Sequence, residues 1–237
     1  MLEPHKQAEI DSAAGPPDRK ALHKPFGEPW QPYYFLKWAT IVHALRALSV
    51  EEGASILDVG AGSGWTTAFL AESGYRPTWL DIAPGHLEAA RRRAQRYGVS
   101  SDFAQADMDD FDLGRQFDAC LVFDALHHST RQRAVVQNIA RHLKPGGWVL
   151  FGEPSVLHTI SPHARQTTAT LGWTERGVSV RSLKRDCLSA DLDNFRRFYE
   201  GVGPLDARAL PWQLARLTGQ VLAVAPQASV WLAAQRA

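Results

Sequence analysis

The stretch of sequence that decides the fold is Ile56-Leu57-Asp58-Val59-Gly60-Ala61-Gly62-Ser63-Gly64-Trp65. Its first four residues are mainly apolar and predict a buried strand, and the alternating glycines that follow predict a tight turn. Glycines at such a turn permit positive φ angles and let the backbone approach a ligand, while the N-terminus of a following helix offers free N–H donors. The stretch therefore predicts a cofactor loop between a strand and a helix.

Short apolar runs and helical segments alternate on both sides of this loop. Strands are expected at residues 55–59, 77–81, 102–106, 117–123 and 148–153. Helices are expected at 64–73, 84–97 and 131–143, and an amphipathic helix over 33–48 should precede the first strand. Such alternation indicates βαβ units built around a parallel sheet.

The two ends of the chain follow a different pattern. Residues 1–32 carry several prolines, so we expect a loosely structured lead-in. Beyond Pro154 we expect a loop to about Gly172, then a helix over 181–190, strands over 194–199 and 229–234, and a helix within 211–224. We predict one domain in three sections: lead-in and cap helix (1–52), cofactor-binding core (53–153), and a substrate-side loop with helices and the last two strands (154–237).

Composition limits the partners and the location. The chain has 237 residues, of which 45% are hydrophobic, and 26 Lys and Arg balance 25 Asp and Glu. This balance provides no long-range field for nucleic acid or an anionic membrane, and arginines 91, 92, 93 and 96 are expected to be solvated on a helix. The two cysteines indicate no disulfide framework, and the lack of a long apolar run favours the cytoplasm over a membrane. The oligomeric state stays open.

Two cofactor classes use a glycine loop of this kind. A dinucleotide fingerprint would need a glycine at position 65, where the chain has Trp65, and the bulky indole argues against NAD. The spacing Gly-x-Gly-x-Gly after Leu57-Asp58-Val59 instead resembles motif I of the class I S-adenosylmethionine-dependent methyltransferases. S-adenosylmethionine is therefore the expected cofactor.

The ends of the next strands extend this resemblance. Asp81 closes the second strand, where an open α/β sheet places an acid to accept ribose hydroxyls. Asp107 and Met108 follow the third strand and resemble the family's adenine site, although Asp107 within its acidic run also suits a turn or a helix cap. The blocks 117–128 and 143–150 also resemble the family. The resemblance assigns cofactor contacts to Asp58, Gly60, Ala61, Gly62, Gly64, Trp65, Asp81, Ile82, Asp107, Met108, Phe123 and Asp124.

The resemblance also implies an architecture. It is a doubly wound, Rossmann-like α/β fold with seven strands, mostly parallel, in which the last strand is antiparallel. S-adenosylmethionine would lie across the carboxyl ends of the first four strands. An N-terminal helical cap and the loop after the fifth strand would cover it.

Methyl transfer from a sulfonium is an in-line displacement, so the protein must mainly align the nucleophile and exclude water. A hydroxyl nucleophile also benefits from a positioned base, and His127 and His128 follow the fourth strand at the switch-point crevice. We prefer His128, because methyltransferases with a similar block often place it close to the methyl group, and a structural role for the pair is the alternative. No metal is expected, since Asp124 has no convincing set of carboxylate and carboxamide partners nearby.

The acceptor is less defined by the sequence. The stretch 151–158 and the later 172–175 resemble a subgroup of bacterial glycan and secondary-metabolite methyltransferases, in which Tyr33, Glu153, His158 and Glu175 could hold a polyol. We predict O-methylation of a hydroxylated small molecule. Methylation of N or C, an NAD-dependent oxidoreductase and a non-catalytic cofactor-binding module are the alternatives.

Overall fold

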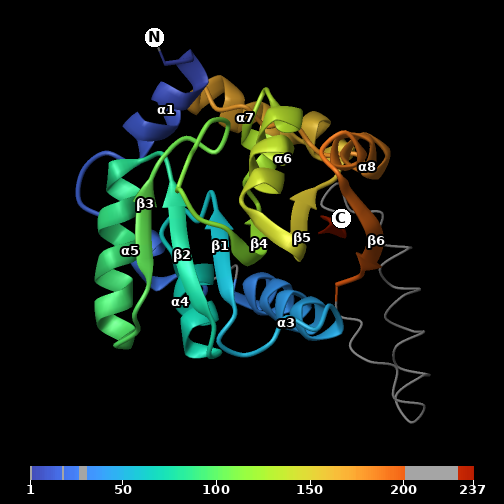
Figure 1. The fold of residues 1–237 in the computed structure, drawn as a ribbon. Coiled ribbons are helices and arrows are strands. Elements are labelled where there is room, and N and C mark those ends of the chain that lie inside the picture. Colours follow the sequence, from blue (N-terminus) through green and yellow to red (C-terminus); the bar gives the residue numbers. More distant parts are fainter. Residues whose placement is uncertain (1, 18, 27–30, 201–228) are drawn as a thin grey trace, which may run out of the picture.

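Seven strands form one twisted sheet in the computed structural model, which describes residues 2–17, 19–26, 31–200 and 229–237 (Figure 1). The strands are β1 (Ser55–Val59), β2 (Arg76–Asp81), β3 (Asp102–Gln105), β4 (Phe117–Phe123), β5 (Leu143–Pro154), β6 (Leu192–Phe198) and β7 (Ser229–Arg236). Their order is β3-β2-β1-β4-β5-β7-β6, and β7 pairs antiparallel with both β5 and β6 while the other pairs are parallel. The predicted mostly parallel, seven-stranded architecture is confirmed.

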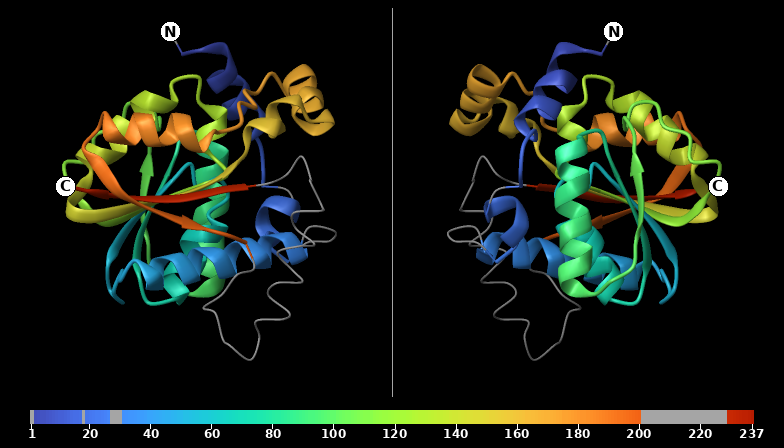
Figure 2. Two further views of the ribbon diagram at one scale, coloured as in Figure 1. Left: turned by 90° about the vertical axis from the view of Figure 1, so that its right-hand side faces the viewer. Right: turned by 90° about the vertical axis from the view of Figure 1, so that its left-hand side faces the viewer.

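Helices cover both faces of the sheet (Figure 2). The helices are α1 (Pro4–Ser12), α2 (Arg19–His23), α3 (Gln31–Ala47), α4 (Trp65–Glu72), α5 (Pro84–Tyr97), α6 (Gln132–Arg141), α7 (Pro162–Leu171) and α8 (Val180–Leu188). Two short 3₁₀ turns, η1 (Leu126–His128) and η2 (Val156–Ile160), follow β4 and β5. Helices α6 and α8 lie on one face, and α3 and α4 lie on the other.

Side chains along β4 point alternately to the two faces of the sheet and so contribute to both halves of the core. Cys120 and Val122 pack with Ile139 of α6, whereas Leu121 and its alternating neighbours pack with Ile41 of α3. All five of these side chains are at most 1% exposed. A parallel sheet that is covered on both faces needs apolar residues at every position, which is why the strand sequences read as continuous hydrophobic runs.

Both predicted loop regions contain helices, so those expectations were wrong. Pro4 begins α1, because proline fits the first helical position, where its missing N–H would have no partner within the helix. Helix α7 also begins with a proline, after Ser161, whose Oγ accepts the Ala164 N–H at 3.1 Å as an N-cap. It ends at Gly172, which has a left-handed φ of 75°. The helix expected within 211–224 lies outside the described residues.

Arg93 on α5 holds the N-terminal segment in place. Its side chain is 2% exposed rather than solvated, so the expectation for this arginine was wrong. Its Nε donates to the Ser63 carbonyl at 3.0 Å, and its two terminal nitrogens donate to the carbonyls of Lys24 and Ala21. One guanidinium thus joins the glycine loop to α2 and to the residue that follows it.

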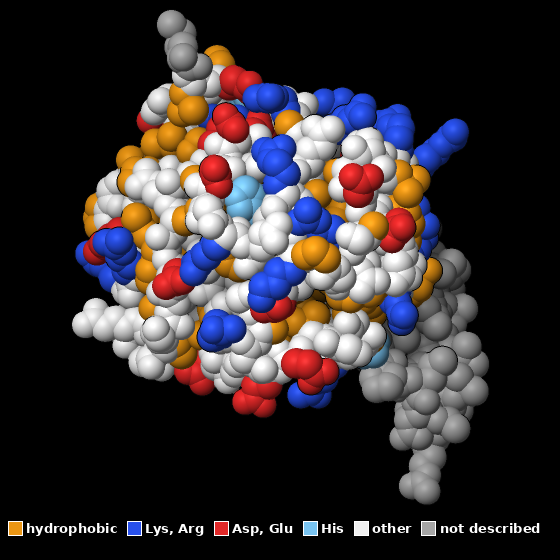
Figure 3. Space-filling model, in the orientation of Figure 1, with side chains coloured by type: hydrophobic (Ala, Val, Ile, Leu, Met, Phe, Trp, Pro, Cys, Tyr) orange, Lys and Arg blue, Asp and Glu red, His pale blue; other side chains and the backbone are white. Residues whose placement is uncertain are grey.

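None of the helices in the described ranges is long and apolar enough to cross a membrane. Lys and Arg side chains alternate with Asp and Glu over much of the face seen in Figure 3. This distribution agrees with the nearly balanced charge of the whole chain.

We expect Arg93→Met to lower the free energy of unfolding by about 1–3 kcal/mol, because three partly buried carbonyls lose a charged donor while the apolar stem is kept. Urea titration followed by tryptophan fluorescence measures the change. Arg92→Met is the matched control, since Arg92 is exposed and pairs with the exposed Glu88 one turn away, and it should stay within about 0.5 kcal/mol of the parent. Equal losses in both variants would contradict the anchoring role of Arg93.

Candidate cofactor and catalytic site

A cavity opens at the edge of the sheet where β1, β2, β3 and β4 end. Helix α1 and Trp173 complete its wall from outside the sheet. Its lining consists of Lys6, Glu9, Gly60, Gly62, Leu80, Asp81, Ile82, Ala83, His86, Ala106, Asp107, Met108, Asp124, Ala125, His128, Ser129 and Trp173. The carboxyl edge of a parallel sheet is where open α/β folds bind ligands.

The three glycines of the loop serve different purposes. A Cβ on Gly60 would lie 2.5 Å from the Cβ of Ala125, and one on Gly64 would lie 2.7 Å from the Cβ of Ala90. A Cβ on Gly62 would meet no protein atom within 4 Å. Gly60 and Gly64 must therefore be glycines, because a side chain would clash with the segment after β4 or with α5. Gly62, between them, faces the open cavity.

Asp58 and Trp65 fix the glycine loop from the side that faces away from the cavity. The Oδ2 of Asp58 accepts the hydroxyls of Thr66 and Thr67, both at 2.6 Å, and burial raises the pKa of this carboxyl to about 6. These bonds fix the end of β1 to the first turn of α4. Trp65 is 3% exposed and packs its ring against Tyr34 and other aromatic residues, away from the cavity.

Asp81 lines the cavity and also orders the loop. Its Oδ2 accepts the Gly62 N–H at 2.8 Å, and its Oδ1 accepts the Ala83 N–H at 3.0 Å and lies 3.1 Å from Nδ1 of His86. Although burial lowers it, the pKa of His86 is raised overall by the hydrogen bond and charge of Asp81. Because a carboxylate offers about four lone-pair positions, Asp81 can still accept from a ligand.

Helix α1 reaches the predicted adenine region through Lys6. The Lys6 Nζ lies 2.7 Å from Oδ2 of Asp107 and 2.6 Å from Oδ2 of Asp109. Asp107 also accepts the Asp109 N–H at 2.9 Å, and Met108 lines the cavity next to it. Sequence reasoning missed Lys6, because the segment was expected to be unstructured.

Two buried polar atoms at the cavity have no hydrogen-bond partner among the described residues. They are Oε1 of Glu9 on α1 and Nε1 of Trp173. Burial, and after it the negative charge of Asp81, raises the pKa of Glu9 to about 8. An unpaired acceptor and an unpaired donor on a cavity wall are groups that a ligand can satisfy. Only the tertiary contacts of α1 reveal Glu9, since residues 1–32 were expected to be loosely structured.

The histidine pair lies in η1, and its two rings are tilted at 40° to each other with their centroids 4.0 Å apart. The Nδ1 of His128 lies 2.9 Å from the Thr174 carbonyl, which can only accept, so Nδ1 carries the proton and Nε2 is free to accept one. Burial, together with the charge of His127, lowers the pKa of His128 to about 4. His128 lines the cavity as a neutral imidazole, whereas His127 lies behind it.

Glu153 of β5 is 0% exposed and holds η1 in place through hydrogen bonds. Its Oε1 accepts the N–H groups of Ala125 and Leu126, both at 3.0 Å, and its Oε2 lies 2.9 Å from Nδ1 of His127. Burial lowers the pKa of His127, but the hydrogen bond and charge of Glu153 outweigh it and raise that pKa to about 9. Asp124, at the start of this turn, lines the cavity with a left-handed φ of 55°.

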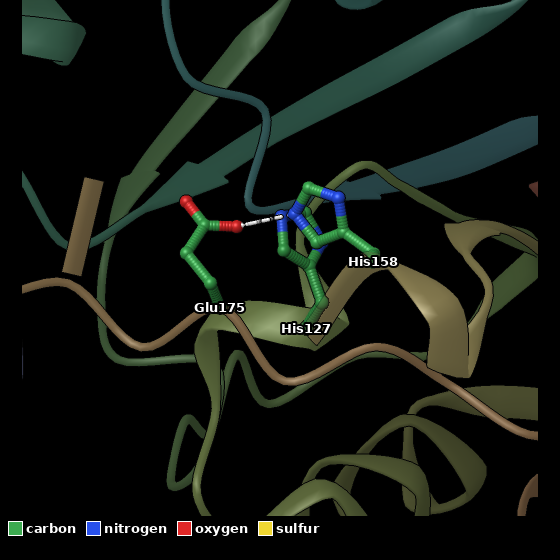
Figure 4. Close-up of side chains that lie close together, drawn as sticks. All are labelled: His127, His158 and Glu175. Carbon is green, nitrogen blue, oxygen red and sulfur yellow. Dashed lines mark hydrogen bonds and ion pairs between the residues drawn. The ribbon is translucent and has the colours of Figure 1, made fainter. Parts of the chain in front are cut away.

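The structure thus separates the predicted site residues into two groups. Those that line the cavity are Gly60, Gly62, Asp81, Ile82, Asp107, Met108, Asp124 and His128. Those that lie outside its lining are Asp58, Ala61, Gly64, Trp65, Phe123, Tyr33, His127, Glu153, His158 and Glu175. Of the second group, His127, His158 and Glu175 lie close together in a cluster of their own (Figure 4).

Known proteins resemble both the sequence and the fold. A family model described as a methyltransferase domain matches residues 56–147. A ubiquinone biosynthesis O-methyltransferase from Methylocella silvestris is 32% identical over 178 residues, which cover 70% of this chain and 68% of that one. A demethylmenaquinone methyltransferase from Tropheryma whipplei is 35% identical over 111 residues, or 46% of each chain.

Solved structures extend the likeness in fold across the whole chain. Magnesium protoporphyrin IX methyltransferase from Synechocystis PCC 6803, with bound S-adenosylmethionine, covers 100% of this chain and 99% of its own with a TM-score of 0.67 and 14% identity. Phosphoethanolamine N-methyltransferase 2 from Haemonchus contortus, in complex with S-adenosylmethionine, covers 91% of this chain and 56% of its own with a TM-score of 0.64 and 16% identity. Because 32% identity to the Methylocella protein extends over two thirds of both chains and the strand order is that of these enzymes, this chain belongs to the class I S-adenosylmethionine-dependent methyltransferases.

Proposed function

We propose that this methyltransferase transfers the methyl group to a hydroxyl oxygen of a small molecule, with His128 as the proton acceptor. The observation that carries the proposal is the tautomer of His128. Its Nδ1 donates to the Thr174 carbonyl at 2.9 Å, so an unprotonated Nε2 is available on the cavity wall. A base held in this way suits a hydroxyl nucleophile, which must lose a proton during transfer.

The residues present fit S-adenosylmethionine. The open space at Gly62 leaves room for the cofactor against the backbone. Oε1 of Glu9 accepts no hydrogen bond from the described residues, and a cationic ligand beside it would favour the ionised carboxylate. We assign Asp81 to the ribose hydroxyls, and Asp107 with Met108 to the adenine. When bound, the cofactor supplies an electrophilic methyl group on a sulfonium. The chain's own residues orient the acceptor, remove its proton at His128 Nε2 and exclude water beneath α1.

The acceptor class follows from the relatives and from the segment after β5. The Methylocella relative is named as an O-methyltransferase of ubiquinone biosynthesis. In this chain, α7 carries exposed polar side chains, whereas η2 exposes mainly apolar ones, so both a sugar and a less polar hydroxylated molecule are candidate acceptors. We therefore test catechols and sugars as acceptors with S-adenosylmethionine labelled in the methyl group, and identify products by mass spectrometry. Methylation of amines alone would contradict the proposal.

We expect Gly62→Ala to weaken S-adenosylmethionine binding at least tenfold in calorimetry, because the new methyl group enters the space left for the ligand. Gly98→Ala is the matched control. Gly98 also has a positive φ and open space around its Cβ, but it lies at the end of α5 and outside the cavity lining. Both variants should lose similar stability, about 1 kcal/mol, and only Gly62→Ala should lose affinity. Equal affinities would remove the loop from the cofactor site.

Glu9 predicts a pH dependence of cofactor binding. Its pKa of about 8 means that the carboxyl is mainly protonated at pH 7, and a cationic ligand favours the ionised form. Affinity for S-adenosylmethionine should therefore rise with pH up to about 8 and then level off. Affinity for S-adenosylhomocysteine, which lacks the sulfonium charge, should rise less.

The variant Glu9→Gln should remove this difference, so that the ratio of the two affinities no longer changes with pH. Calorimetry at several pH values measures the ratio. A ratio that still rises in Glu9→Gln would assign the effect to another group.

We expect His128→Ala to lower turnover by about 10²–10⁴ and to change S-adenosylmethionine affinity less than about threefold, because His128 acts on the acceptor. His163→Ala on the exposed face of α7 serves as the control and should keep its turnover. Near-normal turnover of His128→Ala on every acceptor of the panel would show that alignment alone drives transfer.

A further inference from the structure

Three side chains from separate segments lie close together beside η1, the turn that carries both histidines (Figure 4). They are His127 of η1, His158 of η2 and Glu175, which lies between α7 and α8. Oε2 of Glu175 lies 2.6 Å from Nε2 of His158 and 3.6 Å from Nε2 of His127. One ligand atom from each residue lies within 4.8 Å of the other two.

The hydrogen bonding of His127 directs its second nitrogen toward Glu175. Glu153 can only accept, so Nδ1 of His127 carries a proton and donates to it at 2.9 Å. Nε2 of the same ring then faces the carboxylate of Glu175 at 3.6 Å. A proton or a metal ion can lie between these two atoms, because each of them offers a lone pair.

Burial and ligand chemistry indicate what kind of cation fits. The side chains of His127 and Glu175 are each 5% exposed and that of His158 is 12% exposed, so the cluster is largely buried and most accessible from η2. Two imidazole nitrogens and one carboxylate oxygen are a preferred ligand set for zinc and similar divalent ions. Glu153 occupies the position of the outer carboxylate that orients a metal-bound histidine.

We propose that His127, His158 and Glu175 bind a divalent transition-metal ion of the Zn²⁺ type, with Glu153 orienting His127. Ligand atoms about 2.0–2.1 Å from a tetrahedral ion lie about 3.3 Å apart. The Glu175–His158 pair, now at 2.6 Å, would therefore open by about 0.7 Å, and the Glu175–His127 pair, now at 3.6 Å, would close by about 0.3 Å. Three protein ligands leave a position for a water or an acceptor oxygen, whose pKa a bound Zn²⁺ lowers. The earlier expectation of no metal considered partners of Asp124 and not this histidine cluster.

Metal binding is tested on the full, tag-free chain after chelator treatment. Zn²⁺ is titrated by calorimetry, and Co²⁺ is used as a spectroscopic probe of tetrahedral coordination. We expect one equivalent to bind, a visible Co²⁺ absorption band, and a rise in the thermal midpoint with Zn²⁺. His158→Ala and Glu175→Gln should each abolish the band. Glu153→Gln should weaken Zn²⁺ binding by about 10–100-fold, the effect expected of an outer-shell partner.

His163→Ala is the matched control, because its ring centroid lies 6.2 Å from that of His158 but it is outside the cluster. It should bind Zn²⁺ as the parent does. Circular dichroism and S-adenosylmethionine titration of every variant confirm that the fold and the cofactor cavity remain. Absence of one-to-one binding, or binding that His158→Ala leaves intact, would overturn the proposal and show that a proton supplies the charge.

The outcome is independent of the proposed O-methylation, because metal binding is measured without an acceptor. A chain that binds one Zn²⁺ but methylates no hydroxyl would contradict the proposed function alone. A chain that methylates hydroxyls fully after chelation, and binds no metal, would contradict this site alone.

Discussion

The close approach of the glycine loop to the turn after β4 holds the two halves of the site together. Gly60 and Ala125 are so near that a single added methyl group would place two carbons 2.5 Å apart. This contact fixes the loop that follows β1 against η1, which carries both histidines. Glu153 then secures η1 from the other side through two backbone N–H groups and the ring of His127. The glycine loop, η1 and the end of β5 are consequently joined by direct contacts.

The sequence predicted the central sheet well, because its determinants are local. Strands β1, β4 and β5 contain apolar runs bounded by turn residues, and the motifs at the ends of β1 to β4 follow their strands directly in the sequence. Gly62, Asp81 and His128 could be placed at one edge of the sheet for this reason. Parallel strands bring their carboxyl ends together whatever the rest of the chain does.

The remainder of the site depends on contacts between distant parts of the chain. Helix α1 lies against the cavity because Lys6 reaches Asp107 and Asp109, about one hundred positions away, and no local pattern encodes that pairing. Arg93 looked like its solvated neighbours, and only its three carbonyl partners show that it is structural. His158 and Glu175 likewise lie beside His127 because η2 and the segment after α7 turn back toward η1.

The position of α1 has a consequence for kinetics. A helix whose side chains form part of the cavity wall, and whose Lys6 is paired with two carboxylates, restricts the route to the cavity. If the cofactor occupies that cavity, a fresh molecule enters and a spent one leaves when the helix detaches. The slow event of each cycle would then be the opening of this flap, a motion on the microsecond to millisecond scale that limits many enzymes in place of chemistry.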